Sequence, residues 1–183
     1  MILAIDPGLA TCGWALVAAH TGRVHDLGVL ITKSNSKLGK GIDRVARLEW
    51  QTQKLYDLVN GDWGVRSIAA EAMSFPRGRT AAIVSLCLSW GAIVGLAMSR
   101  SLPIRQIQPK RWRSAVVPGS VGETGYDAVF AALSEFVDEQ AAESLAKIKP
   151  GDRTHALDAV GVGVYAALTP EIVARETKQR RRA

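Results

Sequence analysis

The order of short apolar segments along the chain limits its fold more than any other feature of the sequence. Near the N-terminus, residues 2–5, 12–17 and 23–31 are three such segments, separated by turn-forming residues such as Asp6-Pro7-Gly8 and His20-Thr21-Gly22. Segments of this length, joined by short turns, predict β-strands that pair with their neighbours along the chain. The N-terminal part therefore predicts a three-stranded antiparallel meander.

Beyond this meander, helical and extended patterns alternate. Apolar residues spaced three or four apart predict a helix from residue 42 to residue 59, which Asn60-Gly61 would end. The remaining patterns predict strands at 67–71 and 103–107, helices at 80–99, 126–136 and 152–168, and an irregular stretch at 110–125. The expected fold is α/β, with a mixed five-stranded sheet (an antiparallel meander plus two parallel strands) flanked by helices.

The length of the chain, 183 residues, suits one domain with a core of its own. We expect a single domain over residues 1–176 and a basic C-terminal tail at 177–183. The two cysteines, Cys12 and Cys87, have no other cysteine or histidine at metal-binding spacing, which favours buried thiols in a reducing compartment. The N-terminus lacks the pattern of a signal peptide, so we expect a cytoplasmic protein.

The apolar segment at residues 80–99 requires a choice between two environments. It contains no charged residue, and its length approaches that of a membrane-spanning helix. However, it contains hydroxyl side chains at four positions and lies between two expected strands of one sheet. A helix that is covered by the sheet and by a partner subunit also loses its polar face. We therefore expect a buried helix and no membrane span.

Two acidic residues stand at the ends of expected apolar strands. Asp6 follows residues 2–5, and Glu71 follows residues 67–70. A carboxylate in such a place is costly unless it is paired or bound to a metal ion. Ligands gather at the carboxyl ends of strands in α/β sheets, so the two carboxylates would meet there if their strands are neighbours. Their repulsion then requires a cation or a shared proton, and their hard oxygen atoms suit Mg²⁺ or Mn²⁺.

His155 and Asp158 lie three residues apart in the last expected helix and therefore share one of its faces. The residues that follow them are largely apolar, so a charged group facing inward needs a partner. A buried His–Asp pair taken alone is more often structural. Together with Asp6 and Glu71, the pair favours a metal site built from all four residues.

Three motifs match a known family in order and in spacing. Ile2-Leu3-Ala4-Ile5-Asp6-Pro7-Gly8, with Gly13-Trp14-Ala15 after it, resembles the opening of RuvC-type Holliday junction resolvases. Ala70-Glu71 before an apolar helix resembles their second motif, and His155-Ala156-Leu157-Asp158-Ala159 resembles their last. The resemblance spans most of the chain, and the weak match outside the motifs suggests a phage member of the family.

The resemblance implies a ribonuclease-H-like sheet, a homodimer with two active sites, and paired symmetric nicks across a four-way (Holliday) DNA junction. Asp6, Glu71 and Asp158 match the catalytic acids of the family, and His155 falls where many members have an aspartate. All four are expected to be catalytic and metal-binding residues. Two Mg²⁺ or Mn²⁺ ions per active site would activate a water and stabilise the leaving 3′ oxygen. The expected enzyme is a crossover junction endodeoxyribonuclease.

Contacts to branched DNA are expected from two further segments. Apolar side chains after Glu71 can wedge against unstacked bases, although such residues also cap cores. A basic cluster with an interleaved tryptophan can bind phosphates and stack a base, although it also suits a solvated turn. The candidate DNA-binding residues are Met73, Phe75, Arg77, Lys110, Arg111, Trp112 and Arg113.

Other functions compete with junction resolution. The formal net charge of +6 favours a nucleic-acid partner, but it does not select one. A nuclease of the same fold with broader specificity would cut flaps, forks or RNA, and a non-catalytic protein would only bind junctions. Asp6-Pro7-Gly8 after a first strand also resembles the phosphate loop of actin-like kinases and ATPases, which need a second lobe that this length does not allow.

Overall fold

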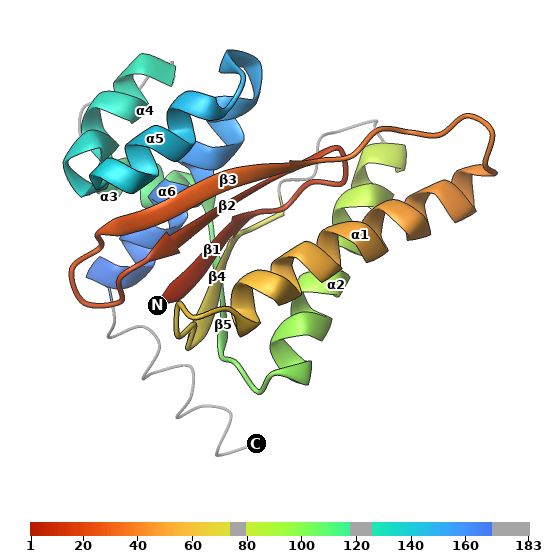
Figure 1. The fold of residues 1–183 in the computed structure, drawn as a ribbon, viewed down its shortest axis with the longest axis horizontal. Coiled ribbons are helices and arrows are strands. Elements are labelled where there is room, and N and C mark those ends of the chain that lie inside the picture. The colour runs from red at the N-terminus through yellow and green to blue at the C-terminus, as the bar shows by residue number, and fades with distance from the viewer. Residues whose placement is uncertain (74–79, 118–125, 170–183) are drawn as a thin grey trace.

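The computed structural model describes residues 1–73, 80–117 and 126–169 (Figure 1). Its five strands form one mixed sheet in the order β3-β2-β1-β4-β5. β1 (Ile2–Asp6), β2 (Thr11–Val17) and β3 (Val24–Ile31) pair in antiparallel fashion, whereas β4 (Ser67–Glu71) and β5 (Ile104–Ile107) extend the sheet in parallel with β1. The expected α/β sheet, an antiparallel meander plus two parallel strands, is confirmed.

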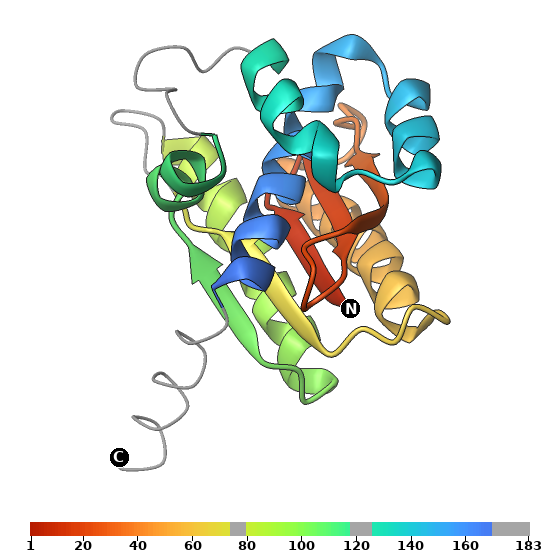
Figure 2. The same ribbon diagram turned by 90° about the vertical axis from the view of Figure 1, so that its left-hand side faces the viewer.

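Helices cover both faces of this sheet. α1 (Lys40–Asn60) and α2 (Thr80–Ser99) cover one face, toward which Leu3 and Ile5 of β1 point. Ile2 and Ala4 point to the other face. That face is covered by α3 (Pro109–Val116), α4 (Tyr126–Leu133), α5 (Glu139–Lys147) and α6 (Arg153–Leu168), with short 3-10 helices at Ser134–Phe136 and Pro150–Asp152. Figure 2 shows α6 lying across the strands, with α1 and α2 behind them.

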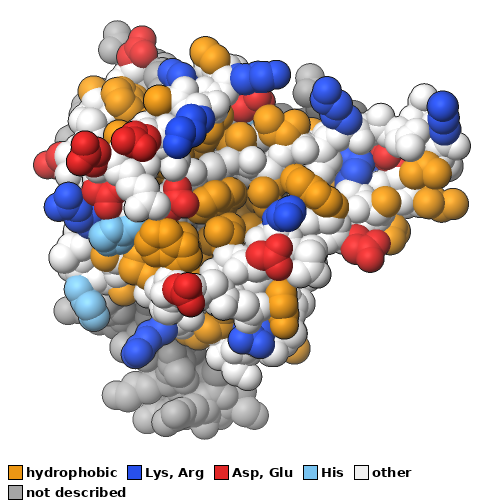
Figure 3. Space-filling model, viewed as in Figure 1, with side chains coloured by type: hydrophobic (Ala, Val, Ile, Leu, Met, Phe, Trp, Pro, Cys, Tyr) orange, Lys and Arg blue, Asp and Glu red, His pale blue; other side chains and the backbone are white. Residues whose placement is uncertain are grey.

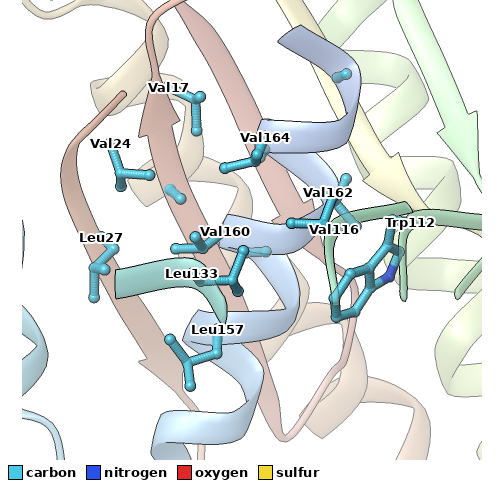
Figure 4. Close-up of a cluster of buried hydrophobic side chains, with 14 of the residues drawn as sticks. Val17, Val24, Leu27, Trp112, Val116, Leu133, Leu157, Val160, Val162 and Val164 are labelled. Atoms are coloured by element: carbon cyan, nitrogen blue, oxygen red, sulfur yellow. The ribbon is translucent and has the colours of Figure 1, made fainter. Parts of the chain in front are cut away.

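α6 is the central helix of its face. Val160, Val162 and Val164 are fully buried, and they pack in one cluster with β-strand residues such as Val17 and with Trp112 of α3 (Figure 4). Each buried aliphatic side chain stabilises the fold by about 1.5–3 kcal/mol. The N-terminal end of α6, where His155 and Asp158 lie, is therefore fixed against the sheet by the rest of the helix.

Two helices lie where the sequence predicted none. The stretch expected to be irregular begins with α3, in which Trp112 and Val116 are the buried positions of an otherwise polar helix. α5 likewise buries only Ala141 and Leu145, and Asp138 caps it by accepting a hydrogen bond from the backbone N–H of Ala141. Short helices with two inward positions carry too little periodicity to stand out in a sequence.

The helices on the other face are less covered than the sequence predicted. Ile42 and Val45 of α1, expected on its buried side, are 65% and 63% exposed, because the first turns of α1 extend beyond the sheet (Figure 1).

α2 buries Ser89, Trp90, Ile93, Leu96 and Ala97. Of its most apolar window only 28% is buried, and by length and composition α2 is the one helix among the described residues that could cross a membrane. The sheet covers one side of α2, and the described part of the chain leaves the opposite side exposed.

Candidate active site

Asp6 and Glu71 lie at the carboxyl ends of two adjacent strands. β1 and β4 are parallel neighbours, and the last residue pair of their register is Ile5 with Ala70. Asp6 and Glu71 each follow directly after that pair, so their side chains emerge at the same edge of the sheet. This placement of the two carboxylates is the one that the strand-end positions predicted.

A close approach between α6 and β2 brings the third part of the site to this edge. Gly13 lies opposite Asp6 in the antiparallel register of β1 and β2. A Cβ atom at Gly13 would lie 1.9 Å from the carbonyl oxygen of His155, so any side chain there would push α6 away. A glycine at position 13, in the first motif, therefore allows α6 to bring His155, in the last motif, next to Asp6.

His155 and Asp6 form the first contact of the site. Nδ1 of the imidazole lies 2.7 Å from Oδ2 of Asp6. The side chain of His155 remains 42% exposed, whereas that of Asp6 is 16% exposed. The hydrogen bond to Asp6 raises the pKa of His155, and burial opposes this effect only partly. The imidazole therefore binds a proton more readily beside the carboxylate than a histidine in water does.

Asp158 and Glu71 are each held by a residue of α3. The guanidinium of Arg113 lies 2.7 Å from Oδ1 of Asp158, and it also stacks over the ring of Trp112 at 4.7 Å. The indole N–H of Trp112 donates to Oε2 of Glu71 at 3.2 Å. Trp90 of α2 fixes the same strand end from the other face, because its N–H donates to the backbone carbonyl of Glu71 at 3.0 Å.

Burial, with a smaller contribution from neighbouring negative charges, raises the pKa values of two carboxylates in the site. Burial, followed by the negative charges of Asp6 and Asp158, raises the pKa of Glu71 to about 7. Burial also raises the pKa of Asp158 to about 6, although the Arg113 guanidinium beside it acts in the opposite direction. The contacts already described give the geometry of this arrangement: His155 contacts Asp6, and the adjacent residues Trp112 and Arg113 contact Glu71 and Asp158. The structure therefore places the four expected site residues at one edge of the sheet.

The carboxylate oxygens of the site suit a hard divalent cation, but they are not grouped as a metal site in the described residues. Among the residues that the structure describes, no three His, Cys, Asp or Glu side chains are grouped so that they could hold a metal ion. Asp6 contacts the imidazole of His155, and Asp158 contacts the guanidinium of Arg113. Carboxylate oxygens such as those of Asp6, Glu71 and Asp158 are the donors that Mg²⁺ and Mn²⁺ prefer.

The expected DNA-binding residues differ in where the structure places them. Trp112 is fully buried and packs on α6, where a Cβ atom at Gly161 would lie 2.3 Å from its ring. The expected stacking of Trp112 on a base is therefore wrong, since its ring belongs to the core. Met73 is partly buried against the core under α2, and Phe75 and Arg77 lie outside the described residues. Lys110 and Arg111 are exposed, whereas Arg113 is engaged by Asp158.

Sequence reasoning missed the residues that hold the loop after Asp6. The side-chain amide of Gln51, which is 4% exposed, donates to the carbonyl oxygens of Gly8 at 3.1 Å and Leu9 at 3.2 Å. Arg47 donates to the same oxygen of Leu9 at 3.2 Å. The signal in the sequence is a polar residue beside the apolar positions of α1: Gln51 precedes Thr52 and Leu55, which were expected on the buried side of the helix.

Comparisons with known proteins agree with this geometry. No family model matches the chain. Its sequence is 30% identical over 118 residues to the crossover junction endodeoxyribonuclease RuvC of Corynebacterium efficiens. The matched region covers 63% of this chain and 49% of the relative. The RuvC of Corynebacterium glutamicum is 27% identical over 120 residues, covering 63% of this chain and 50% of the relative. The chain thus spans about half the length of the curated relatives it matches.

Solved structures share the fold over almost the whole chain. RuvC of T. thermophilus in complex with a Holliday junction substrate superimposes with a TM-score of 0.68 at 17% identity, covering 91% of this chain and 94% of that one. The yeast mitochondrial Holliday junction resolvase Ydc2 gives a TM-score of 0.64 at 12% identity, covering 91% and 77%. The resemblance that the three motifs predicted is confirmed, and the chain has the ribonuclease-H-like fold of the RuvC-type Holliday junction resolvases.

Proposed function

We propose that this chain is a divalent-metal-dependent crossover junction endodeoxyribonuclease that resolves four-way DNA junctions by paired symmetric nicks. The observation that carries the proposal is the shared electrostatic environment of Asp6, Glu71 and Asp158 at one edge of the sheet. The negative charges of Asp6, Glu71 and Asp158 act on one another, and a divalent cation would offset their repulsion. The similarity to RuvC sequences supports DNA junctions as the substrate.

Each residue of the site has a separate task in this proposal. Asp6, Glu71 and Asp158 would hold Mg²⁺ or Mn²⁺, with two ions per active site. Bound ions supply a Lewis acid at the scissile phosphate and a more acidic water. Because Nδ1 of His155 is engaged by Asp6, proton exchange with the substrate would use Nε2, on a side chain that is 42% exposed. Arg113 would leave Asp158 when the ions bind, and its guanidinium would then be available to a phosphate oxygen.

A homodimer is the second part of the proposal, since paired nicks require two active sites. The exposed side of α2 presents Val84, Leu88, Gly91, Gly95 and Met98, which follow one another at intervals of four and three residues. Cβ atoms added at Gly91 and Gly95 would meet no other atom within 4 Å, so a second helix can approach closely there. An apolar stripe of this kind fits a second copy of the same helix. A partner helix packed on this stripe would bury the exposed side of α2, as the prediction of a cytoplasmic protein without a membrane span requires.

The α2 stripe can be tested with a thiol that the chain already has. Cys87 is exposed on α2, whereas Cys12 is buried and burial raises the pKa of its thiol to about 12. A short bis-maleimide should therefore crosslink two chains through Cys87 and fail in Cys87→Ser. Leu88→Glu should convert the dimer to a monomer in light scattering, whereas Val45→Glu, a matched change at an exposed apolar residue of α1, should not.

The substrate is tested by comparing DNA structures at equal concentration. Synthetic four-way junctions, flaps, duplexes and RNA–DNA hybrids should be incubated with Mg²⁺ or Mn²⁺ and with EDTA. The proposal expects metal-dependent cutting of the four-way junction at symmetric positions, giving ends that a ligase seals. Equal cutting of flaps or hybrids would instead show a broader nuclease, and tight junction binding without cutting would show a non-catalytic binder.

A further inference from the structure

Beside the catalytic acids lies an open groove that no step described above uses. It consists of two hollows, of about 450 Å³ and about 650 Å³, which share Leu9, Arg47, Ala82 and Ser85 in their walls. His155 lines the smaller hollow, so the groove begins at the active site. The larger hollow is lined by the segment 34–36 and by residues of the first turns of α1 and α2, and the part lined by Lys40 and Arg44 is called the outer end of the groove.

The outer end of this groove is strongly basic. Between residues 33 and 47 the sequence contains five lysines and arginines and a single acid, Asp43. The carboxylate of Asp43 is already engaged by the backbone N–H of Asn35 at 2.8 Å and by Arg47 at 3.4 Å. Within the described ranges, neither Lys40 nor Arg44 forms an ion pair. Figure 3 shows Lys and Arg side chains at the end of the molecule where α1 begins.

Arg47, which lines both hollows, is hydrogen-bonded to the loop that follows Asp6. Arg47 lies in the walls of both hollows, and it binds the carbonyl of Leu9 and, through Nε at 2.8 Å, the hydroxyl of Thr32. Gln51 holds the neighbouring carbonyl of Gly8. These contacts connect α1, which carries Lys40 and Arg44, to the loop that follows Asp6. Such a connection suits a polyanion that must place one phosphate at the catalytic acids.

We propose that this groove, lined by Lys40, Arg44 and the segment 34–36, binds the sugar-phosphate backbone of the scissile DNA strand as it leaves the active site. The occupant follows from two observations, the excess of positive charge and the continuity with the catalytic edge. Lys40 and Arg44 each contact a phosphate, while Ser34 and Ser36 offer hydroxyl groups to the backbone. The inference rests on the proposed function, because it takes DNA as the substrate.

The first test measures how salt weakens the binding of a four-way junction. Each lost phosphate contact reduces the slope of log K against log salt by about 0.9 on duplex DNA. Lys40→Ala/Arg44→Ala should therefore reduce the slope by about 2, and Arg44→Lys should keep it. The control Arg23→Ala/Lys54→Ala removes two exposed charges away from the groove and should leave the slope unchanged. An unchanged slope in the groove variant, with a normal melting temperature, would overturn the proposal.

The second test locates the strand directly. Fe-EDTA attached to Ser36→Cys, in a Cys87→Ala and Asp6→Asn background, generates hydroxyl radicals inside the groove without cutting by the enzyme. The scissile strand should be cleaved within a few nucleotides of the normal nick, and the control Lys54→Cys should give no such cleavage. Cleavage that is spread evenly over all arms would overturn the proposal.

These outcomes separate the groove from the proposed function. If the wild-type chain binds junctions but does not cut them, the nuclease proposal fails, and the salt slope and the radical footprint still decide the groove. If the wild-type chain cuts junctions and the groove variants bind as it does, the groove fails alone. If the chain binds no DNA at all, both proposals are overturned.

Discussion

His155 and Asp6 are 149 positions apart in the sequence, yet Nδ1 of one lies 2.7 Å from Oδ2 of the other. This contact ties the start of α6 to the end of β1, and the pair Arg113–Asp158, also at 2.7 Å, ties α3 to α6. Both contacts place a basic side chain against an acid that the nuclease proposal assigns to metal binding.

Asp6→Asn should abolish cleavage while junction binding survives. An asparagine side chain keeps the shape of Asp6 and its contact with His155, but it removes a charge that a divalent cation needs. Gel-shift titration and a cleavage assay on the same junction check the two halves of the prediction. Equal loss of binding and cleavage, with an unfolded circular dichroism spectrum, would make Asp6 a structural residue instead.

His155→Asp should retain cleavage with Mg²⁺. A carboxylate is a harder ligand than an imidazole, so the variant offers a metal ion at least as good a partner. It also places a second negative charge next to Asp6, so the metal-free variant should melt at a lower temperature than the wild type at pH 8. A folded variant without activity would show that the imidazole itself takes part in the reaction.

The metal-free protein should become less stable as the pH rises from about 5 to about 8. The pKa of Glu71 is raised to about 7, that of Asp158 to about 6, and that of His155 is raised as well. A raised pKa means that the folded state binds protons more tightly than the unfolded state, so each group stabilises the fold at low pH and loses this effect as it deprotonates. Melting temperatures in EDTA at several pH values measure the trend, and excess Mg²⁺ should reduce it.

Glu71→Gln should raise the melting temperature of the metal-free protein at pH 8 and abolish cleavage. The amide keeps an oxygen that accepts from the indole of Trp112, and it removes the charge that Asp6 and Asp158 repel. A gain on the order of 1–2 kcal/mol in the free energy of unfolding is expected, since one pKa unit corresponds to about 1.4 kcal/mol. A loss of stability would show that Glu71 is stabilised by its surroundings rather than strained by them.

Trp112→Phe should leave junction affinity unchanged, because the ring is buried and cannot stack on a base. The variant keeps most of the packing on Gly161 but loses the N–H that donates to Glu71, so the optimum pH for cleavage should rise. Trp112→Ala should cost about 3–5 kcal/mol of stability through the cavity it leaves. Fluorescence anisotropy with labelled junctions and denaturant titrations measure the two effects. A large loss of affinity in Trp112→Phe would restore the stacking role.

The sequence predicted those parts of the molecule that local patterns control. The strand ends at Asp6 and Glu71 stood out because an acid after an apolar run is rare. Their carboxylates were expected to meet if the two strands are neighbours, and the structure shows that β1 and β4 are. The face shared by His155 and Asp158 followed from helical spacing alone. The fold could therefore be predicted without coordinates, whereas the meeting of the strand-end acids depended on which strands are neighbours.

The parts that failed depend on contacts between distant segments. Trp112 stands among basic residues, and only the packing of α3 on Gly161 shows that its ring belongs to the core. Ile42 and Val45 have the spacing of a buried face, but the sheet ends before it reaches them. The roles of Arg47 and Gln51 depend on carbonyl groups about forty positions away, which no local pattern encodes.

The most direct measurement is a crystal structure of the chain with a four-way junction and Mn²⁺, in which anomalous scattering locates the ions. The nuclease account predicts Mn²⁺ at about 2.0–2.3 Å from carboxylate oxygens of Asp6, Glu71 and Asp158, beside one phosphate, with Arg113 released from Asp158. Junction DNA bound at this edge, with no anomalous peak and with both His155–Asp6 and Arg113–Asp158 contacts intact, would contradict it.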